Sequence, residues 1–132
     1  MKNGNYIPQN TRDIEAVERL KLLPFKSINK KDIPKLLEWL QDSHWEVAEG
    51  IAIYLLPHVN EIAEELLFIL NTDDATWKYC VINVLIARSK EKLAPDLIQA
   101  LTRIAEFPSK IDADDTVDDA AKDVIRNKSL CG

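Results

Sequence analysis

The chain has 132 residues, of which 46% are apolar and 30% charged, so it can form one globular domain and is too apolar for a disordered protein. Its net charge of -5 at pH 7 disfavours a nucleic-acid partner, because a polyanion would be repelled unless the cations formed a local stripe. The apolar run at residues 51–57 is shorter than the roughly 20 residues of a membrane span, and the first ten residues lack an apolar signal segment, so we expect a cytoplasmic protein.

The elements expected along the chain are all helices, because apolar residues recur with helical spacing and no segment alternates with a period of two for long enough to form a strand. Residues 1–10 are expected to be a flexible terminus. Residues 11–23 then predict a helix with Ile14 and Val17 on its apolar face and Pro24 after its end. We expect this helix to cap the amino-terminal end of the domain.

The rest of the chain predicts three helix pairs, at residues 32–56, 59–88 and 93–127. The first pair opens with Asp32 as an N-cap and Pro34 in the first turn, which is where proline is tolerated. The second helix of the middle pair is apolar on nearly every side, so it should be the most buried. The chain as a whole is therefore predicted to be a single all-α domain.

The second helices of the three pairs share one spacing, in which an acidic residue is followed at +3 by a large apolar residue and at +6 by a small one. An acidic N-cap accepts hydrogen bonds from free backbone N–H groups, and a small residue lets the helix approach its neighbour closely. Three such units, with a capping helix before them, predict a short HEAT-like α-solenoid. The residues at these positions are Asp42, Trp45 and Ala48; Asp74, Trp77 and Cys80; and Asp114, Val117 and Ala120.

The tryptophans are residues for which a binding role must be weighed against a packing role. Trp45 and Trp77 fall at the same repeat position, so we expect them to pack at the turn between two helices. Trp39 lies on the flank of its apolar stripe, where it could either cover the next repeat or stand partly exposed. It is therefore a candidate for contact with a partner protein, together with Glu46 and Glu49 on the polar side of the following helix.

Four blocks of the sequence resemble a known family. The blocks are "AVERLKLLPF" at 16–25, "LLEWLQDSHWEVA" at 36–48, "DDATWKYCVI" at 73–82 and the ending "RIAEFPSK…DDAAKDVI". In combination they are similar to the small bacterial domain-of-unknown-function family numbered five-zero-seven-one, over about residues 6–125. The chain departs from that pattern at Glu46, where proline is expected, and at Cys80, where an aromatic residue is common. The resemblance supports the helical architecture and implies no established activity, so it transfers no catalytic residue.

The sequence offers few residues for catalysis or for holding a cofactor. The two histidines, His44 and His58, stand in no nucleophile motif, and Cys80 is expected to fill the core of a nearly all-apolar helix. His58, Glu61 and Glu65 share one helix face, but the HExxH pattern and a second carboxylate–histidine copy are absent. Glu46 and Glu49 could act as acid and base only in a cleft that the sequence does not predict. We therefore expect no enzyme activity, no metal and no cofactor.

An acidic stretch near the carboxyl terminus has a partial likeness to a calcium-binding loop. Asp112, Asp114, Thr116 and Asp123 fall at ligand positions, but Val117 stands where the loop needs glycine. The stretch is therefore expected to be a solvated acidic helix start.

The function that follows from these observations is a non-enzymatic module that binds another protein. An immunity protein that neutralises a basic toxin domain is a special case that the negative charge favours. A HEAT-like enzyme acting on nucleic acid is an alternative, but it would need a stripe of cations, and the available ones are dispersed. These cations are Lys78, Arg88, Arg103 and Arg126. A structural or regulatory adaptor is a third possibility that only its partner would distinguish.

Overall fold

The computed structural model describes residues 6–42 and 44–131, with side chains as far as residue 127. Residues 1–5 of the predicted flexible terminus lie outside this range. Within the described residues every regular element is a helix, which confirms the all-α class. The α-helices are α1 (Ile14–Lys21), α2 (Ile33–Leu37), α3 (Glu46–Leu55), α4 (Ala63–Leu70), α5 (Ala75–Val81), α6 (Pro95–Glu106), α7 (Lys110–Asp114) and α8 (Val117–Cys131).

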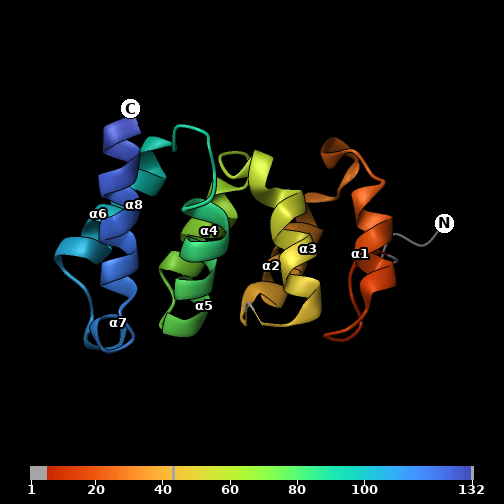
Figure 1. Ribbon diagram of the computed structural model, residues 1–132, viewed down its shortest axis with the longest axis horizontal. Helices are drawn as coiled ribbons and strands as arrows, with labels where there is room; N and C mark the ends of the chain where they lie inside the picture. Colours follow the sequence, from red (N-terminus) through yellow and green to blue (C-terminus); the bar gives the residue numbers. More distant parts are fainter. Residues whose placement is uncertain (1–5, 43, 132) are drawn as a thin grey trace.

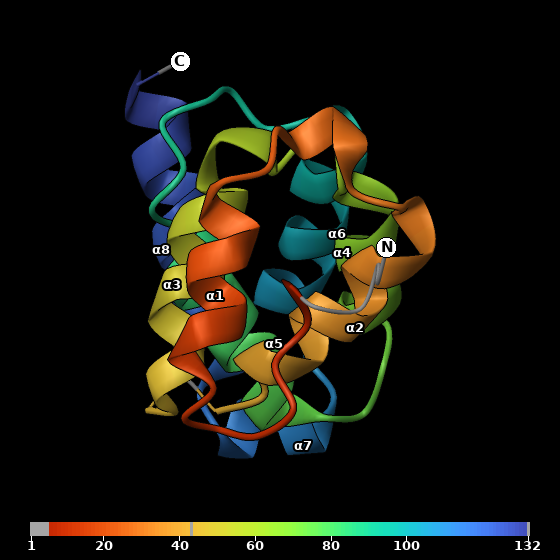
Figure 2. The ribbon, with the colours of Figure 1, turned by 90° about the vertical axis from the view of Figure 1, so that its right-hand side faces the viewer.

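The helices form a row that follows the order of the chain. Figure 1 shows α1 at one end of the long axis and α8 at the other. Seen along this row, α1, α3 and α8 lie on one side and α2, α4 and α6 on the other (Figure 2). Within the first layer α1 packs against α3, and within the second α4 packs against α6, while α6 and α8 pack against each other across the layers. Each helix therefore makes its main contacts with near neighbours in the row.

Short segments of tighter or wider helix extend several of these elements. The segment η4 (Glu38–Leu40) continues α2 as a 3₁₀ turn. The segment η6 (Ile82–Ile86) continues α5 as a π-helix, in which the N–H of Ala87 donates to the carbonyl of Ile82 at 2.7 Å. A π turn contains one residue more than an α turn, so η6 widens the end of α5 before it meets α3 and α8.

Helix starts are set by side chains that accept hydrogen bonds from the first turn. The carboxylate of Asp74 accepts from the N–H of Trp77 at 3.0 Å and thereby caps α5. The side chain of Asp13 caps α1 in the same way, and proline occupies the first turn of α2 and of α6. The acidic cap predicted for the second helix of the middle pair is therefore present.

The other two acidic caps predicted from the repeat spacing are not the N-caps of their helices. Trp45 is the N-cap of α3, and the carboxylate of Asp42 accepts instead from the N–H of His44 at 2.9 Å. Asp114 is the last residue of α7, where its carboxylate pairs with Lys110 at 3.0 Å. In both places the chain needs additional residues in the turn before the second helix can begin.

The helix α7 is an element that the sequence pattern did not predict. Ser109 caps it by accepting from the N–H of Asp112 at 3.1 Å, so a helix starts before the acidic stretch. Thr116 then has a φ of 60°, a left-handed conformation that ends one helix and lets α8 start in a new direction. The predicted range 93–127 consequently holds three α-helices within the described residues.

The core is a continuous set of aliphatic side chains between the two layers, including Leu20, Leu36 and Ile51, all fully buried. At the amino-terminal end, α1 and α3 approach closely at Gly50, where a β carbon would lie 2.5 Å from Cγ1 of Val17. Tyr6 is also buried and donates a hydrogen bond to Asp32, so the end of the predicted flexible segment lies against the core. None of the helices in the described part of the chain is long and apolar enough to cross a membrane.

Candidate functional site

The two acidic residues predicted to contact a partner lie in the first turn of α3. Both are exposed, and each already pairs with an arginine from a neighbouring segment. Glu46 lies 3.3 Å from the Nε atom of Arg12, and both carboxylate oxygens of Glu49 lie 3.2–3.3 Å from the guanidinium of Arg88. Exposed pairs of this kind stabilise a fold by at most about 1 kcal/mol, so the arginines hold these two carboxylates only weakly.

Trp39 belongs to η4, the 3₁₀ turn that continues α2. Its ring is half-buried and meets the ring of Trp45 edge-on, with 5.7 Å between centroids and 68° between planes. Both rings pack against the hydrophobic core. Trp39 therefore packs against Trp45 of its own helix pair and keeps part of its surface exposed, as one of the two alternatives left by the sequence expected.

The remaining repeat positions lie at contacts between helices. The indole Nε1–H of Trp77 donates to the carbonyl of Leu37 at 2.9 Å, so this side chain joins α5 to the end of α2. The Sγ atom of Cys80 lies 3.8 Å from the carbonyl of Gln41. The small residues of the three units are buried; they are Ala48, Cys80 and Ala120. Val117, the large residue of the third unit, is buried as well.

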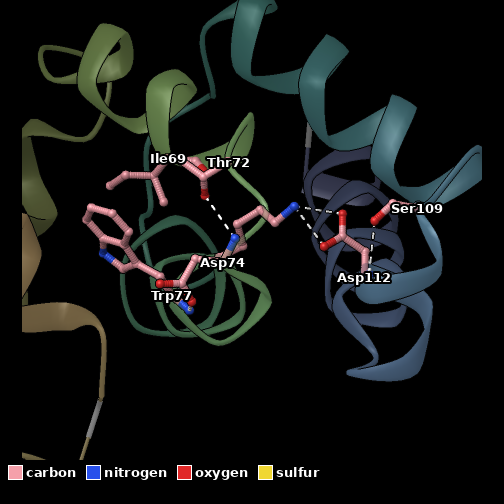
Figure 3. A network of polar contacts seen from close by, with 7 residues as sticks. Ile69, Thr72, Asp74, Trp77, Ser109 and Asp112 are labelled. Carbon is pink, nitrogen blue, oxygen red and sulfur yellow. Dashed lines mark hydrogen bonds and ion pairs between the residues drawn. The ribbon is translucent and has the colours of Figure 1, made fainter.

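A buried ion pair joins α5 to α7, and sequence reasoning missed it. The Nζ atom of Lys78 lies 2.7 Å from Oδ1 and 2.9 Å from Oδ2 of Asp112 (Figure 3). Only 3% of the surface of Lys78 and 4% of that of Asp112 are exposed. The signal in the sequence was a lysine within an otherwise apolar helix, because a buried ammonium requires a carboxylate nearby.

A cavity of about 250 Å³ opens between the α2–η4 segment and α4; we refer to it as the α2/α4 pocket. Its walls are mostly apolar and carry two carboxylates. The lining residues are Pro34, Leu37, Glu38, Glu65, Phe68, Ile69 and Trp77. The bond from Trp77 to Leu37 fixes one wall of the pocket, whereas Phe68 is 69% exposed.

Glu65 is a largely buried carboxylate among the residues that line this pocket. Its side chain is only 10% exposed, and its Oε2 atom lies 2.8 Å from Nζ of Lys30. The Oε1 atom is buried and has no hydrogen-bond partner. Glu64 also pairs with Lys30, at 3.3 Å, and the carboxylates of Glu65 and Glu64 raise the pKa of Lys30 above its ordinary value. The Oε1 atom is thus unsatisfied within the fold and has almost no surface that a group in the pocket could reach.

The side chains of His58, Glu61 and Glu65, which the sequence places on one helix face, do not meet at one point in the structure. Nδ1 of His58 lies 2.6 Å from Glu61, and the His58 ring stacks on Phe25 with 4.0 Å between centroids. Glu65 points instead to Lys30. Within the side chains that the structure describes, no group of three or more histidine, cysteine or acidic residues is placed to hold a metal ion.

Comparison with known proteins identifies a family that matches most of the chain. The family described as "Domain of unknown function (DUF5071)" matches residues 6–125, which is nearly the whole chain and the range over which the sequence blocks resemble it. No curated protein matches the chain. The resemblance inferred from the sequence is confirmed by this match, and the chain belongs to the DUF5071 family.

Proposed function

We propose that this protein is a non-enzymatic, cytoplasmic interaction module, built as a short HEAT-like α-solenoid of three helix pairs behind the capping helix α1. The two-layer row of helices, in which neighbours make the main contacts, supports the solenoid. In such a stack one layer of helices forms an extended surface that can dock another protein.

The observation that carries the proposal is a set of large apolar side chains left exposed on α1, on α3 and on α5, whose continuation η6 contacts α3 and α8. Ile14 on α1, Ile53 on α3 and Tyr79 on α5 are each 41–47% exposed. Single exposed apolar residues are common, but a series along adjacent helices is typical of a protein-binding surface. Glu46 and Glu49 belong to the same layer, and with Trp39 they are the proposed contacts.

The charge of the chain favours a basic partner. A net charge of -5 attracts a basic protein and speeds its association. An immunity protein that neutralises a basic toxin domain is the biological role that fits such a partner. A toxin gene beside the gene for this chain would support that role, and an isolated gene would count against it.

A nucleic-acid partner has less support. The four cations that a nucleic-acid groove would need are each bonded to a side chain of the protein itself. The pairs are Lys78 with Asp112, Arg88 with Glu49, Arg103 with Asn71 and Arg126 with Asp123. Three of the four charges are thus matched by a carboxylate within the fold.

The experiment that tests the proposal is affinity purification of the tagged chain from its native lysate, followed by mass spectrometry and reconstitution with the purified partner. We expect one stoichiometric partner. Ile53→Ser should weaken that complex at least about tenfold, because it removes an apolar contact from the proposed surface. Phe107→Ser is the matched control, since Phe107 is also exposed but lies at the end of α6 in the other layer.

Two results would contradict the proposal. One is the absence of any stoichiometric partner under conditions that recover known complexes. The other is an equal loss of affinity with Ile53→Ser and Phe107→Ser, which would place the contact outside the proposed layer.

A further inference from the structure

We propose that α7 is a latch, a short helix that opens while the rest of the fold stays intact and thereby uncovers the ammonium group of Lys78. The Lys78–Asp112 pair keeps the latch closed. The segment that moves is 109–116, and α7 within it lies at the lower edge of the molecule in Figures 1 and 2. The inference does not depend on the proposed function, because it concerns a motion within the chain itself.

The first observation is the burial pattern of this segment. Asp112 is buried, whereas every other residue from 109 to 116 is exposed. Ile111, the largest apolar side chain of α7, is 47% exposed. The helix therefore adds almost no apolar area to the core, and its opening costs little of the hydrophobic stabilisation that holds the longer helices together.

The second observation is how the buried pair is bonded. Nζ of Lys78 lies close to both carboxylate oxygens of Asp112, but the buried Oδ1 atom makes no well-aligned hydrogen bond. Both charges have lost their water, and a buried pair offsets that loss fully only when further hydrogen bonds satisfy its remaining atoms. Opening returns both groups to water, so hydration recovers part of the attraction that is lost.

The third observation is the backbone at the end of the segment. Thr116 has a φ of 60°, a left-handed conformation that is unfavourable for a β-branched residue. Opening allows Thr116 to return to an ordinary conformation, so strain at this joint favours the open state. A helix of five residues is also unstable in water by itself, so α7 unfolds once it leaves α5.

The test is native-state hydrogen exchange of the full chain, followed by NMR. The amides of Ala113 and Asp115 donate to the carbonyls of Ser109 and Ile111, so they report whether α7 is formed. We expect a protection factor on the order of 10²–10⁴ for these amides, at least about tenfold below that of the slowest amides of α6 and α8. Low concentrations of urea should hardly change it, because the opening exposes little surface.

A second measurement follows Lys78 directly. The N-hydroxysuccinimide ester of acetic acid acetylates accessible amines, and mass spectrometry of the digested chain gives the initial rate at each lysine. Lys110, with 87% of its side chain exposed, is the reference. We expect Lys78 to react more slowly than Lys110 by the factor that protects the α7 amides, within about tenfold, because one opening controls both.

Matched variants assign the latch to the buried pair and to the joint. Asp112→Asn should reduce the protection of the α7 amides below about tenfold and bring the acetylation of Lys78 within about tenfold of that of Lys110. Thr116→Gly should raise the protection about three- to tenfold, because glycine adopts the left-handed conformation without strain. Asp114→Asn, which breaks only an exposed pair, should change it less than about threefold.

Two results would overturn the inference. One is exchange of the α7 amides at the rate of the slowest amides and with the same dependence on urea, which would mean that α7 opens only when the whole chain unfolds. The other is acetylation of Lys78 far slower than the opening of α7, which would mean that its ammonium stays covered. Both comparisons are made on the wild-type chain and on Thr116→Gly, so they hold even if Asp112→Asn fails to fold.

Discussion

Tyr6, near the amino terminus, makes the stability of the fold depend on pH in the alkaline range. Its phenol is buried and donates a hydrogen bond to the carboxylate of Asp32. Burial, together with the bond to Asp32 and the negative charge of that residue, raises the pKa of Tyr6 from 10.0 to about 12. The folded chain therefore keeps this proton at a pH at which the unfolded chain has lost it.

The first prediction is a loss of stability between about pH 10 and about pH 12. The contribution of Tyr6 is complete below the unfolded pKa and disappears as the pH rises through the folded pKa. Urea unfolding at a series of pH values should show a steeper fall for the wild-type chain than for Tyr6→Phe, which cannot ionise. Parallel pH profiles for the two proteins would contradict the assignment.

At the scale of the element, the contact between α1 and α3 depends on the absence of one side chain. Gly50 lies within α3, where alanine would normally be more favourable by about 1 kcal/mol. The close approach of Val17 opposes this gain, because a β carbon would lie 2.5 Å from its Cγ1 atom and a β-branched side chain has little freedom to move.

The second prediction follows from these opposed effects. Gly50→Ala should destabilise the protein by about 1–2 kcal/mol through overpacking. In a Val17→Ala background the same substitution should become neutral or stabilising by up to about 1 kcal/mol, because the clash is gone and the helix propensity remains. Chemical unfolding of the four proteins in a double-mutant cycle measures this coupling. If the effects of the two substitutions on the free energy of unfolding are additive, α1 moves aside for the added methyl group without strain.

The helices themselves were largely predictable from sequence, whereas their boundaries were less so. Apolar stripes and prolines located α1 to α6, and the acidic cap of α5 at Asp74 was predicted correctly. The helix α7 was not predicted because it depends on the cap at Ser109 and on the left-handed conformation of Thr116. Such single-residue features do not appear in the hydrophobic periodicity that identifies longer helices.

The polar contacts were less predictable than the helices, for a related reason. Glu65 attracted attention only for its spacing from His58 and Glu61 on one helix face. Its actual partner, Lys30, lies 35 residues earlier in the chain, and Lys78 similarly pairs with Asp112 across 34 residues. Local spacing describes one helix at a time, so contacts of this length become visible only when the helices are placed together.

At the scale of the whole molecule, the Lys78–Asp112 pair connects the middle of the row to its carboxyl-terminal end. The third prediction is that Asp112→Asn destabilises the protein by about 3–5 kcal/mol, because it leaves the buried ammonium of Lys78 without a counter-charge. Asp114→Asn is the control, since it breaks only the exposed pair with Lys110 and should change stability by less than about 0.5 kcal/mol.

Thermal and urea unfolding of these two variants beside the wild-type chain make the measurement. Similar losses in both would indicate that the acidic stretch acts through its total charge. A large loss in Asp112→Asn alone would show that one desolvated pair holds α7 against α5.

The π-helix at Ile82–Ile86 has a consequence for how the length of the chain can vary. Because the bond from Ala87 to Ile82 encloses one residue more than an α turn, deleting one residue there can convert the segment to ordinary α-helix while both flanking faces keep their directions. The same deletion inside α6 would rotate every following side chain by about 100° and move its apolar face away from α8. Relatives of this protein that differ by a single-residue gap are therefore expected to carry that gap in η6.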